Sequence, residues 1–181
     1  MDETHPVHRR WVLFAHSYLL YARSVERALL PWGLSLPQFL TLFLLRNSSK
    51  PVTMSVLANY LGQMNQSATS LAQRMGGRGL IEKVPNPEDR RSSVLRLLPE
   101  GEAVLDETWG LVLETVARFF SPLAEEIQVE FEDILRLLRD SAAAELGLDS
   151  EKLDFATRSL ERDPDMWAQA QAIRESVASR R

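Results

Sequence analysis

Residues 53–80 read TMSVLANYLGQMNQSATSLAQRMGGRGL, and this stretch predicts two short helices joined by a tight turn. Thr53 is a residue type that caps helix N-termini, and apolar residues recur on one face of the helix that follows. Ala58 is small enough for two helices to cross closely, and Gly62 suits a turn that needs a positive φ. The spacing of these residues predicts a helix-turn-helix.

The second of these helices, expected from Asn65 to about Arg78, has two faces of different chemistry. Its inward face carries apolar residues at i, i+3, i+4 and i+7, namely Ala68, Leu71, Ala72 and Met75. Its outward face has no acidic residue and consists mainly of short hydrogen-bonding groups and arginine, which read base edges and bind phosphates in a major groove. We therefore predict DNA contacts from Asn65, Gln66, Ser67, Thr69, Ser70, Gln73 and Arg74.

A β-hairpin is expected directly after this helix. Residues 80–84 and 92–98 have strand patterns, and the polar segment 85–91 joins them. Arg90 and Arg91 at the tip would project two cations that a DNA groove could receive. The alternative is a solvated hairpin with a local ion pair. The position beside the helix favours DNA contact, because helix and hairpin would then lie on either side of one phosphate backbone.

The charge is distributed unevenly along the chain. The net charge is −4, yet residues 46–96 hold eight basic and three acidic groups, a net +5, whereas residues 97–181 carry a net −10. A basic segment that coincides with the predicted helix-turn-helix is the pattern expected of a nucleic-acid-binding surface.

The composition disfavours thiol-based sites, membrane insertion and secretion. The chain has no cysteine, which excludes disulfides, thiolate zinc sites and cysteine-based peroxide sensing within it. It has no apolar run of about 18 residues, and residues 12–17 are too short and polar for a signal peptide, so we expect no membrane partner and a cytoplasmic location. Helical periodicity is expected over 9–30, 35–46, 99–120 and a segment ending at Gly147, and surface helices are expected beyond residue 151.

Four sequence segments together resemble the multiple antibiotic resistance regulator (MarR) family. They are Leu36-Pro37-Gln38-Phe39, Leu57-Ala58-x-x-Leu61-Gly62, Arg78-Gly79-Leu80-Ile81, and Asp89-Arg90-Arg91 followed by Leu97-Leu98-Pro99-Glu100-Gly101. The resemblance covers residues 9–146 and is most specific across 57–101. It implies a mainly α fold with a small β-wing, in which a winged helix-turn-helix is joined to N- and C-terminal dimerisation helices. It further implies a homodimeric transcriptional regulator, usually a repressor, that binds pseudo-palindromic double-stranded DNA.

The same resemblance implies boundaries and residue roles. We expect an N-terminal dimerisation helix in 1–34, the DNA-binding domain in 35–101, long dimerisation helices in 102–147 and an extension of open role in 148–181. Arg90 would enter a minor groove, while Asp89 would hold the wing through an ion pair with Arg74 or Arg91. The sequence departs from the MarR family pattern at two helix ends. Gly76-Gly77 would soften the end of the recognition helix, because glycine favours helix less than alanine does. Leu98 stands where relatives commonly have a threonine that can cap the next helix.

A small aromatic or anionic effector is also implied, held in a partly apolar pocket between the dimer core and the DNA-binding lobe. The expected pocket residues are Trp11, Tyr18, Phe39, Phe43 and Trp109. An ordinary hydrophobic core would account for the same residues.

We predict no cofactor, no metal and no enzymatic activity. His5, His8 and His16 cluster, but no acidic residue stands at ligand spacing between His8 and His16. No glycine-rich phosphate loop or nucleophile–base set with supporting context is present. Two alternatives to a DNA-binding regulator remain: a regulator-derived protein-binding module that uses the acidic C-terminal half, and a small enzyme on a helical scaffold.

Overall fold

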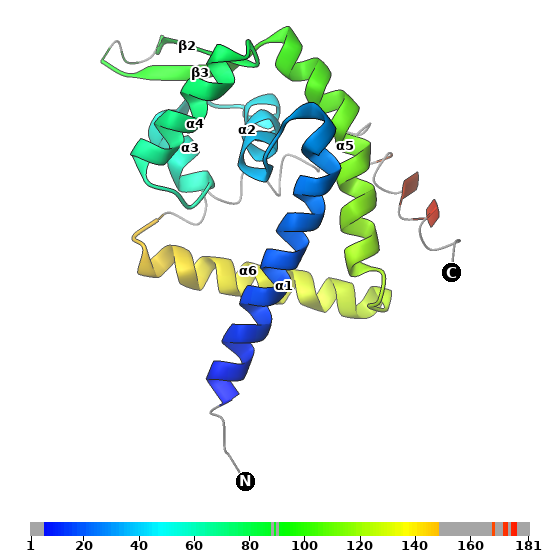
Figure 1. The fold of residues 1–181 in the computed structure, drawn as a ribbon. Coiled ribbons are helices and arrows are strands. Elements are labelled where there is room, and N and C mark those ends of the chain that lie inside the picture. Colours follow the sequence, from blue (N-terminus) through cyan, green and yellow to red (C-terminus); the bar gives the residue numbers. More distant parts are fainter. Residues whose placement is uncertain are drawn as a thin grey trace.

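The computed structural model describes residues 6–87, 89, 91–148, 168, 172, 173, 175 and 176. The predicted wing contact Arg90 and most of the C-terminal extension therefore lie outside the described residues. The elements are α1 (Pro6–Leu29), η1 (Leu30–Trp32), α2 (Leu36–Asn47), β1 (Val52–Thr53), α3 (Met54–Tyr60), α4 (Asn65–Gly77), β2 (Ile81–Pro85), β3 (Ser93–Leu97), α5 (Pro99–Phe120) and α6 (Glu125–Glu145) (Figure 1).

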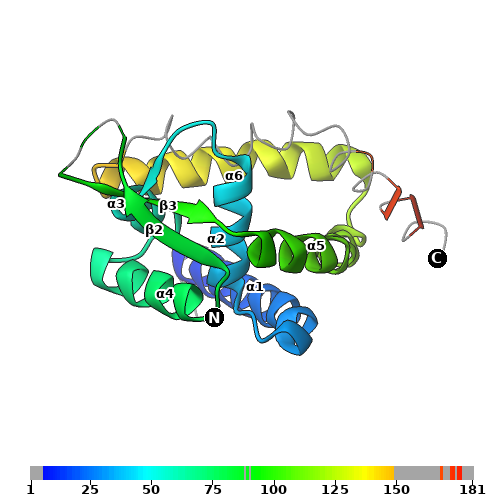
Figure 2. The same cartoon turned by 90° about the horizontal axis from the view of Figure 1, so that it is seen from above.

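The sheet is small and antiparallel, with strand order β1-β3-β2. The predicted hairpin is confirmed as β2 and β3, in the register Ile81 opposite Leu97 and Pro85 opposite Ser93. Strand β1 was not predicted, and its Val52 pairs with Leu95. Figure 1 shows β2 and β3 at the top of the lobe, and in Figure 2 α4 lies along one side of them. A mainly α fold with a β-wing is thus confirmed.

The core lies where α2, α3, α4, the sheet and the first half of α5 meet. Its fully buried side chains include Leu42, Leu57, Met75, Leu80 and Leu105. Ala58 on α3 is buried, α3 packs against α4, and Gly62 in the turn between them has φ +60°, as the predicted helix-turn-helix requires.

Two helix starts, those of α2 and α3, follow local capping chemistry. Ser35 and Gln38 form a capping box at α2, and the Thr53 hydroxyl accepts from the Val56 N–H at α3. Helix α4 begins at Asn65 as expected, and Met64 at its N-cap position gives no side-chain cap. The Asn65 carbonyl accepts from the Thr69 hydroxyl, one turn further on. As predicted, Leu98 gives α5 no side-chain cap.

Helix α1 extends beyond the lobe, and Figure 1 shows its N-terminal half projecting from the other helices of the lobe. One face of α1 carries Val7, Trp11, Phe14 and Tyr18, which we call the apolar α1 stripe, and all four are exposed. The same face continues to Val25 and Leu29, which pack against the lobe and are fully buried. Helix α6 also exposes large apolar side chains, among them Ile127, Ile134, Leu137 and Leu138.

No single helix among the described residues is long and apolar enough to span a membrane. Within the same residues, one pair of helices, Pro6–Trp32 and Leu36–Asn47, is long and apolar enough when taken together, but the pair is bent by 79°.

Candidate nucleic-acid interface

Helix α4 presents the predicted outward face to solvent. Ala68, Leu71 and Met75 are buried and Ala72 is half-buried, as the inward stripe required. The predicted DNA-contacting residues of α4 are all exposed: Asn65, Gln66, Ser67, Thr69, Ser70, Gln73 and Arg74. The structure therefore brings them together on one open face.

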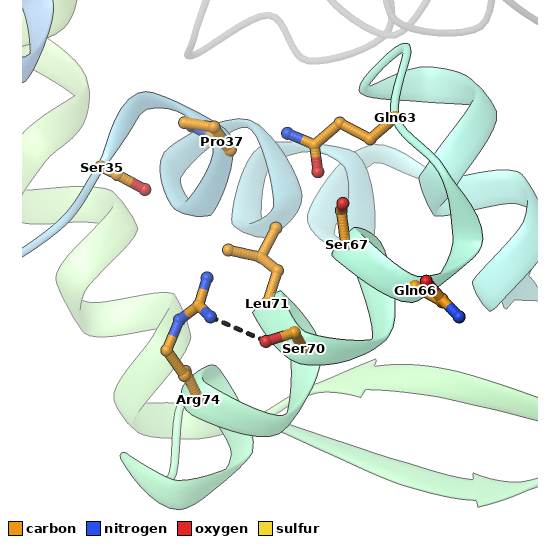
Figure 3. A pocket seen from close by; sticks show the side chains of 8 residues that line it. All are labelled: Ser35, Pro37, Gln63, Gln66, Ser67, Ser70, Leu71 and Arg74. Atoms are coloured by element: carbon orange, nitrogen blue, oxygen red, sulfur yellow. Dashed lines mark hydrogen bonds between the residues drawn. The ribbon is translucent and has the colours of Figure 1, made fainter.

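Beside this face lies a polar hollow of about 440 Å³ (Figure 3). It is lined from the start of α2, from the α3–α4 turn and from α4, by Ser35, Pro37, Gln63, Gln66, Ser67, Ser70, Leu71 and Arg74. Arg74 is the only charged residue among these eight, and none is acidic. Such a lining can donate several hydrogen bonds to an anion and repels none.

Arg74 has a different partner from the one expected. Its guanidinium donates to the Ser70 hydroxyl at 2.9 Å, as Figure 3 shows, instead of pairing with Asp89. The Asp89 carboxylate accepts from the Arg91 backbone N–H at 3.0 Å, and among the described residues it forms no ion pair with Arg74 or Arg91. The ion-pair prediction is therefore wrong. A short acidic side chain satisfies a backbone donor two residues away more readily than a charge on another element.

The wing is closed by polar contacts near its tip. Asn86 is buried, and its side chain donates to the Ser92 hydroxyl at 2.8 Å. The Asp89 carbonyl accepts from the Ser92 N–H at 2.9 Å. Nearer the base, the Arg96 guanidinium donates to Glu82 across the two strands at 2.7 Å. These contacts stiffen the hairpin while the Arg91 side chain stays exposed.

The residues that build this lobe match a family model. Residues 32–92, which run from η1 through the recognition helix to the wing, match the MarR family. This segment is about a third of the chain, and over it the chain is similar to the MarR family. The mainly helical fold with its small three-stranded sheet agrees with this similarity.

Individual proteins and solved structures are also similar to this chain. The HTH-type transcriptional regulator PecS from Dickeya dadantii (strain 3937) is 28% identical over 119 residues, which are 65% of this chain and 72% of PecS. The PcaV regulator from Streptomyces coelicolor, solved with its natural ligand, is 29% identical with a TM-score of 0.62, over 78% of this chain and 97% of PcaV. A mutant of E. coli MarR solved with operator DNA is 21% identical with a TM-score of 0.68, over 76% of this chain and 99% of the mutant.

The aromatic residues expected at an effector pocket separate into two groups in the structure. Trp109 on α5 stacks on Phe43 and Phe39 of α2, with ring centroids 5.3 and 6.3 Å apart. All three are buried, which fits the core alternative, yet the buried Trp109 Nε1 has no hydrogen-bond partner among the described residues. Trp11 and Tyr18 are 64% and 56% exposed on α1, so one chain does not bring them to this cluster.

Two partly buried tyrosines have shifted pKa values. Burial raises the pKa of Tyr60, at the end of α3, to about 12. Burial, and next the neighbouring Tyr18, raise the pKa of Tyr21 on α1. Neither side chain is therefore expected to ionise near neutral pH.

Sequence reasoning missed residues whose partners are far along the chain. Asn86 was treated only as a turn residue. The sequence marks Arg78 only as the approximate end of the helix, but its guanidinium donates to the carbonyls of Trp32 and Gly33. No local pattern signals such contacts, which join residues 45 and 46 positions apart.

Proposed function

We propose that this chain is a homodimeric, sequence-specific repressor that binds pseudo-palindromic double-stranded DNA and releases it when a small effector binds. The observation that carries the proposal is the exposed, acid-free face of α4 next to the polar hollow. An ordinary exposed helix carries glutamate and lysine, whereas this face carries amides, hydroxyls and Arg74.

In this proposal the contacts divide by chemistry. Gln66 and Gln73 can read base edges, because an amide forms paired hydrogen bonds with adenine. Arg74, with the hydroxyls of Ser67 and Ser70, would hold backbone phosphates at the polar hollow. Arg90 at the wing tip would enter a minor groove, and Arg91 would contact a flanking phosphate.

The exposed apolar surfaces support a homodimer. The apolar α1 stripe is continuous with the buried Val25 and Leu29, so its exposed half is a face without a partner in one chain. Large apolar side chains on α6 are exposed as well. Covering such a face stabilises a complex by about 25 cal/mol per Å² of apolar area. A second copy of the chain would also place two α4 helices for the two halves of a pseudo-palindrome.

The cluster of Phe39, Phe43 and Trp109 supports an effector site. The unpartnered Trp109 Nε1 would donate to an acceptor on an aromatic or anionic ligand. In a dimer, Trp11 and Tyr18 would contribute from α1, and PcaV, a relative, was solved with its natural ligand. Because the cluster joins α2 to α5, a ligand there would favour one arrangement of lobe and dimer helices over another.

A titration of the purified protein on the promoter region flanking its own gene tests the proposal. Fluorescence anisotropy is followed across a salt series, with nonspecific competitor DNA present. We expect nanomolar binding that survives competitor and weakens steeply with salt. Binding no better than to competitor, repeated with sites selected from genomic DNA, would favour the protein-binding module.

A further inference from the structure

The C-terminal end of the recognition helix is tied to the linker between α1 and α2. Arg78 follows α4 directly, and its guanidinium donates to the Gly33 carbonyl and to the Trp32 carbonyl, each at 2.7 Å. Both carbonyls lie at the end of η1, where Gly33 turns the backbone with φ +61°. A cation that binds two adjacent carbonyls at a helix end is held in direction as well as in distance.

The same linker is tied to α5. The Trp32 indole Nε1 donates to the Glu107 carboxylate at 2.7 Å. One residue earlier on α5, Asp106 forms an ion pair with Arg46 at the end of α2. A path of hydrogen bonds therefore runs from Arg78 through Trp32 to Glu107, which we call the brace.

The rest of α4 is held by contacts that fix its direction less strictly. Its buried residues, Ala68, Leu71 and Met75, are apolar, and apolar packing is non-directional. Its last turn contains Gly76 and Gly77, which favour helix less than alanine does. Hydrogen bonds lose strength steeply when their angle changes, so the brace resists rotation of α4.

From this geometry we infer that the brace sets the direction of α4 relative to α5. The brace thereby sets the spacing between DNA half-sites that the protein accepts, an inference that rests on the proposed function. Each recognition helix of a dimer binds one half-site, so its angle to the dimer helices fixes the distance between the two recognition helices. Arg78, Trp32 and Glu107 are positioning residues here. Their exposed bonds add little to the free energy of folding, and their effect is on geometry.

The test compares the selected operator with versions that have one or two base pairs inserted or deleted between the half-sites. Trp32→Phe keeps the aromatic ring and both backbone carbonyls but removes the Nε1 donor. Glu107→Ala removes the acceptor, and Glu107→Gln keeps an oxygen that can still accept. Glu102→Ala, an exposed acidic residue on the same helix, is the control.

We expect the wild type and Glu102→Ala to lose at least about tenfold in affinity when the spacing changes. For the same changes in spacing, Trp32→Phe and Glu107→Ala should lose less than about threefold in affinity, because each lobe can then turn to follow the DNA. Glu107→Gln should restore part of the spacing preference. Affinity for nonspecific DNA and the thermal midpoint should stay near wild-type values in all variants.

Brace variants that keep the wild-type spacing preference would overturn the inference while leaving the proposed function intact. The same holds if their affinity falls equally on every DNA, since that indicates a general structural loss. A wild-type protein that binds its operator with no spacing preference would also overturn it. A wild type that binds no operator at all would overturn both proposals.

Discussion

Arg74 occupies a position where its charge is available to DNA. Of the eight residues that line the polar hollow it is the only charged one, and its partner is the neutral Ser70 hydroxyl. An arginine bound to a carboxylate would first have to break that ion pair, whereas this guanidinium can take a phosphate while keeping its existing bond.

We therefore expect Arg74→Ala to weaken operator binding by about 1–3 kcal/mol, without lowering the stability of the wing. Anisotropy titration measures the affinity. Across a salt series, the slope of log affinity against log salt concentration should be smaller in magnitude by about one per lobe. Lys50→Ala, which removes the same charge from an exposed loop of the lobe, is the control. An unchanged slope for Arg74→Ala would contradict a phosphate contact.

Arg90 is predicted to act through groove shape and not through base identity. Arg90→Ala should weaken operator binding by about 1–3 kcal/mol, the value of a good groove contact. The loss should be larger on operators with A-tract flanks, whose narrow minor groove attracts arginine, than on G·C-rich flanks. Equal losses on both flanks would place Arg90 on the phosphate backbone instead.

Tyr60 gives a pH-dependent prediction. Its pKa is raised to about 12 in the folded chain, while an unfolded tyrosine ionises near pH 10. Between about pH 10 and 12 the folded state therefore holds one more proton than the unfolded state, so its free energy of unfolding falls as pH rises. Below pH 10 both states are protonated and Tyr60 contributes no pH dependence.

Tyr60→Phe should accordingly unfold at a higher pH than the wild type in alkaline denaturation followed by circular dichroism. A difference titration of phenolate absorbance between the two proteins isolates Tyr60 from the other tyrosines. A Tyr60 midpoint near pH 10 in the folded protein would contradict the burial of its phenol.

At the scale of elements, local chemistry predicted the helix starts that depend on side chains near in sequence. Ser35, Thr53 and Pro99 begin helices as expected, and Gly62 makes the predicted turn. Strand β1 was missed because its two residues pair only with β3, more than 40 positions away. The outward face of α4 was predicted by its helical period, but the polar hollow was not, because Ser35 and Pro37 reach it only through tertiary packing.

The start of α5 is packed so closely that its sequence is constrained. A Cβ added at Gly101 would overlap the Leu80 carbonyl oxygen and come within 2.7 Å of the Leu97 side chain. A backbone carbonyl cannot turn aside as a flexible side chain does, so the helix would have to shift away from the sheet.

Gly101→Ala should destabilise the protein by about 1–3 kcal/mol, measured as a lower denaturant midpoint at an unchanged slope. Gly110→Ala is the matched control on the same helix, since among the described residues its added Cβ would meet Ile173 alone, at an ordinary 4.0 Å. The higher helix propensity of alanine should leave that variant as stable as the wild type or more stable by about 0.5–1 kcal/mol. Equal effects at both glycines would contradict the close packing at Gly101.

At the scale of the whole molecule, α1 has one apolar face with two different surroundings. Val25 and Leu29 are buried within the chain, whereas Trp11 and Phe14 on the same face are exposed. A charge at Phe14 should leave the lobe intact while making the exposed half of the face unfit for a partner, because burying an unpaired charge costs several kcal/mol.

Phe14→Asp should therefore be a folded monomer at concentrations where the wild type is a dimer, as measured by light scattering. Its affinity for a full operator should fall to that for a half-site duplex, because the second lobe no longer binds as a linked unit. The salt slope should also be about half the wild-type value, since half as many phosphates are neutralised. A variant that stays dimeric would move the interface away from the apolar α1 stripe. A monomer with wild-type affinity and slope would show that one lobe suffices to recognise the operator.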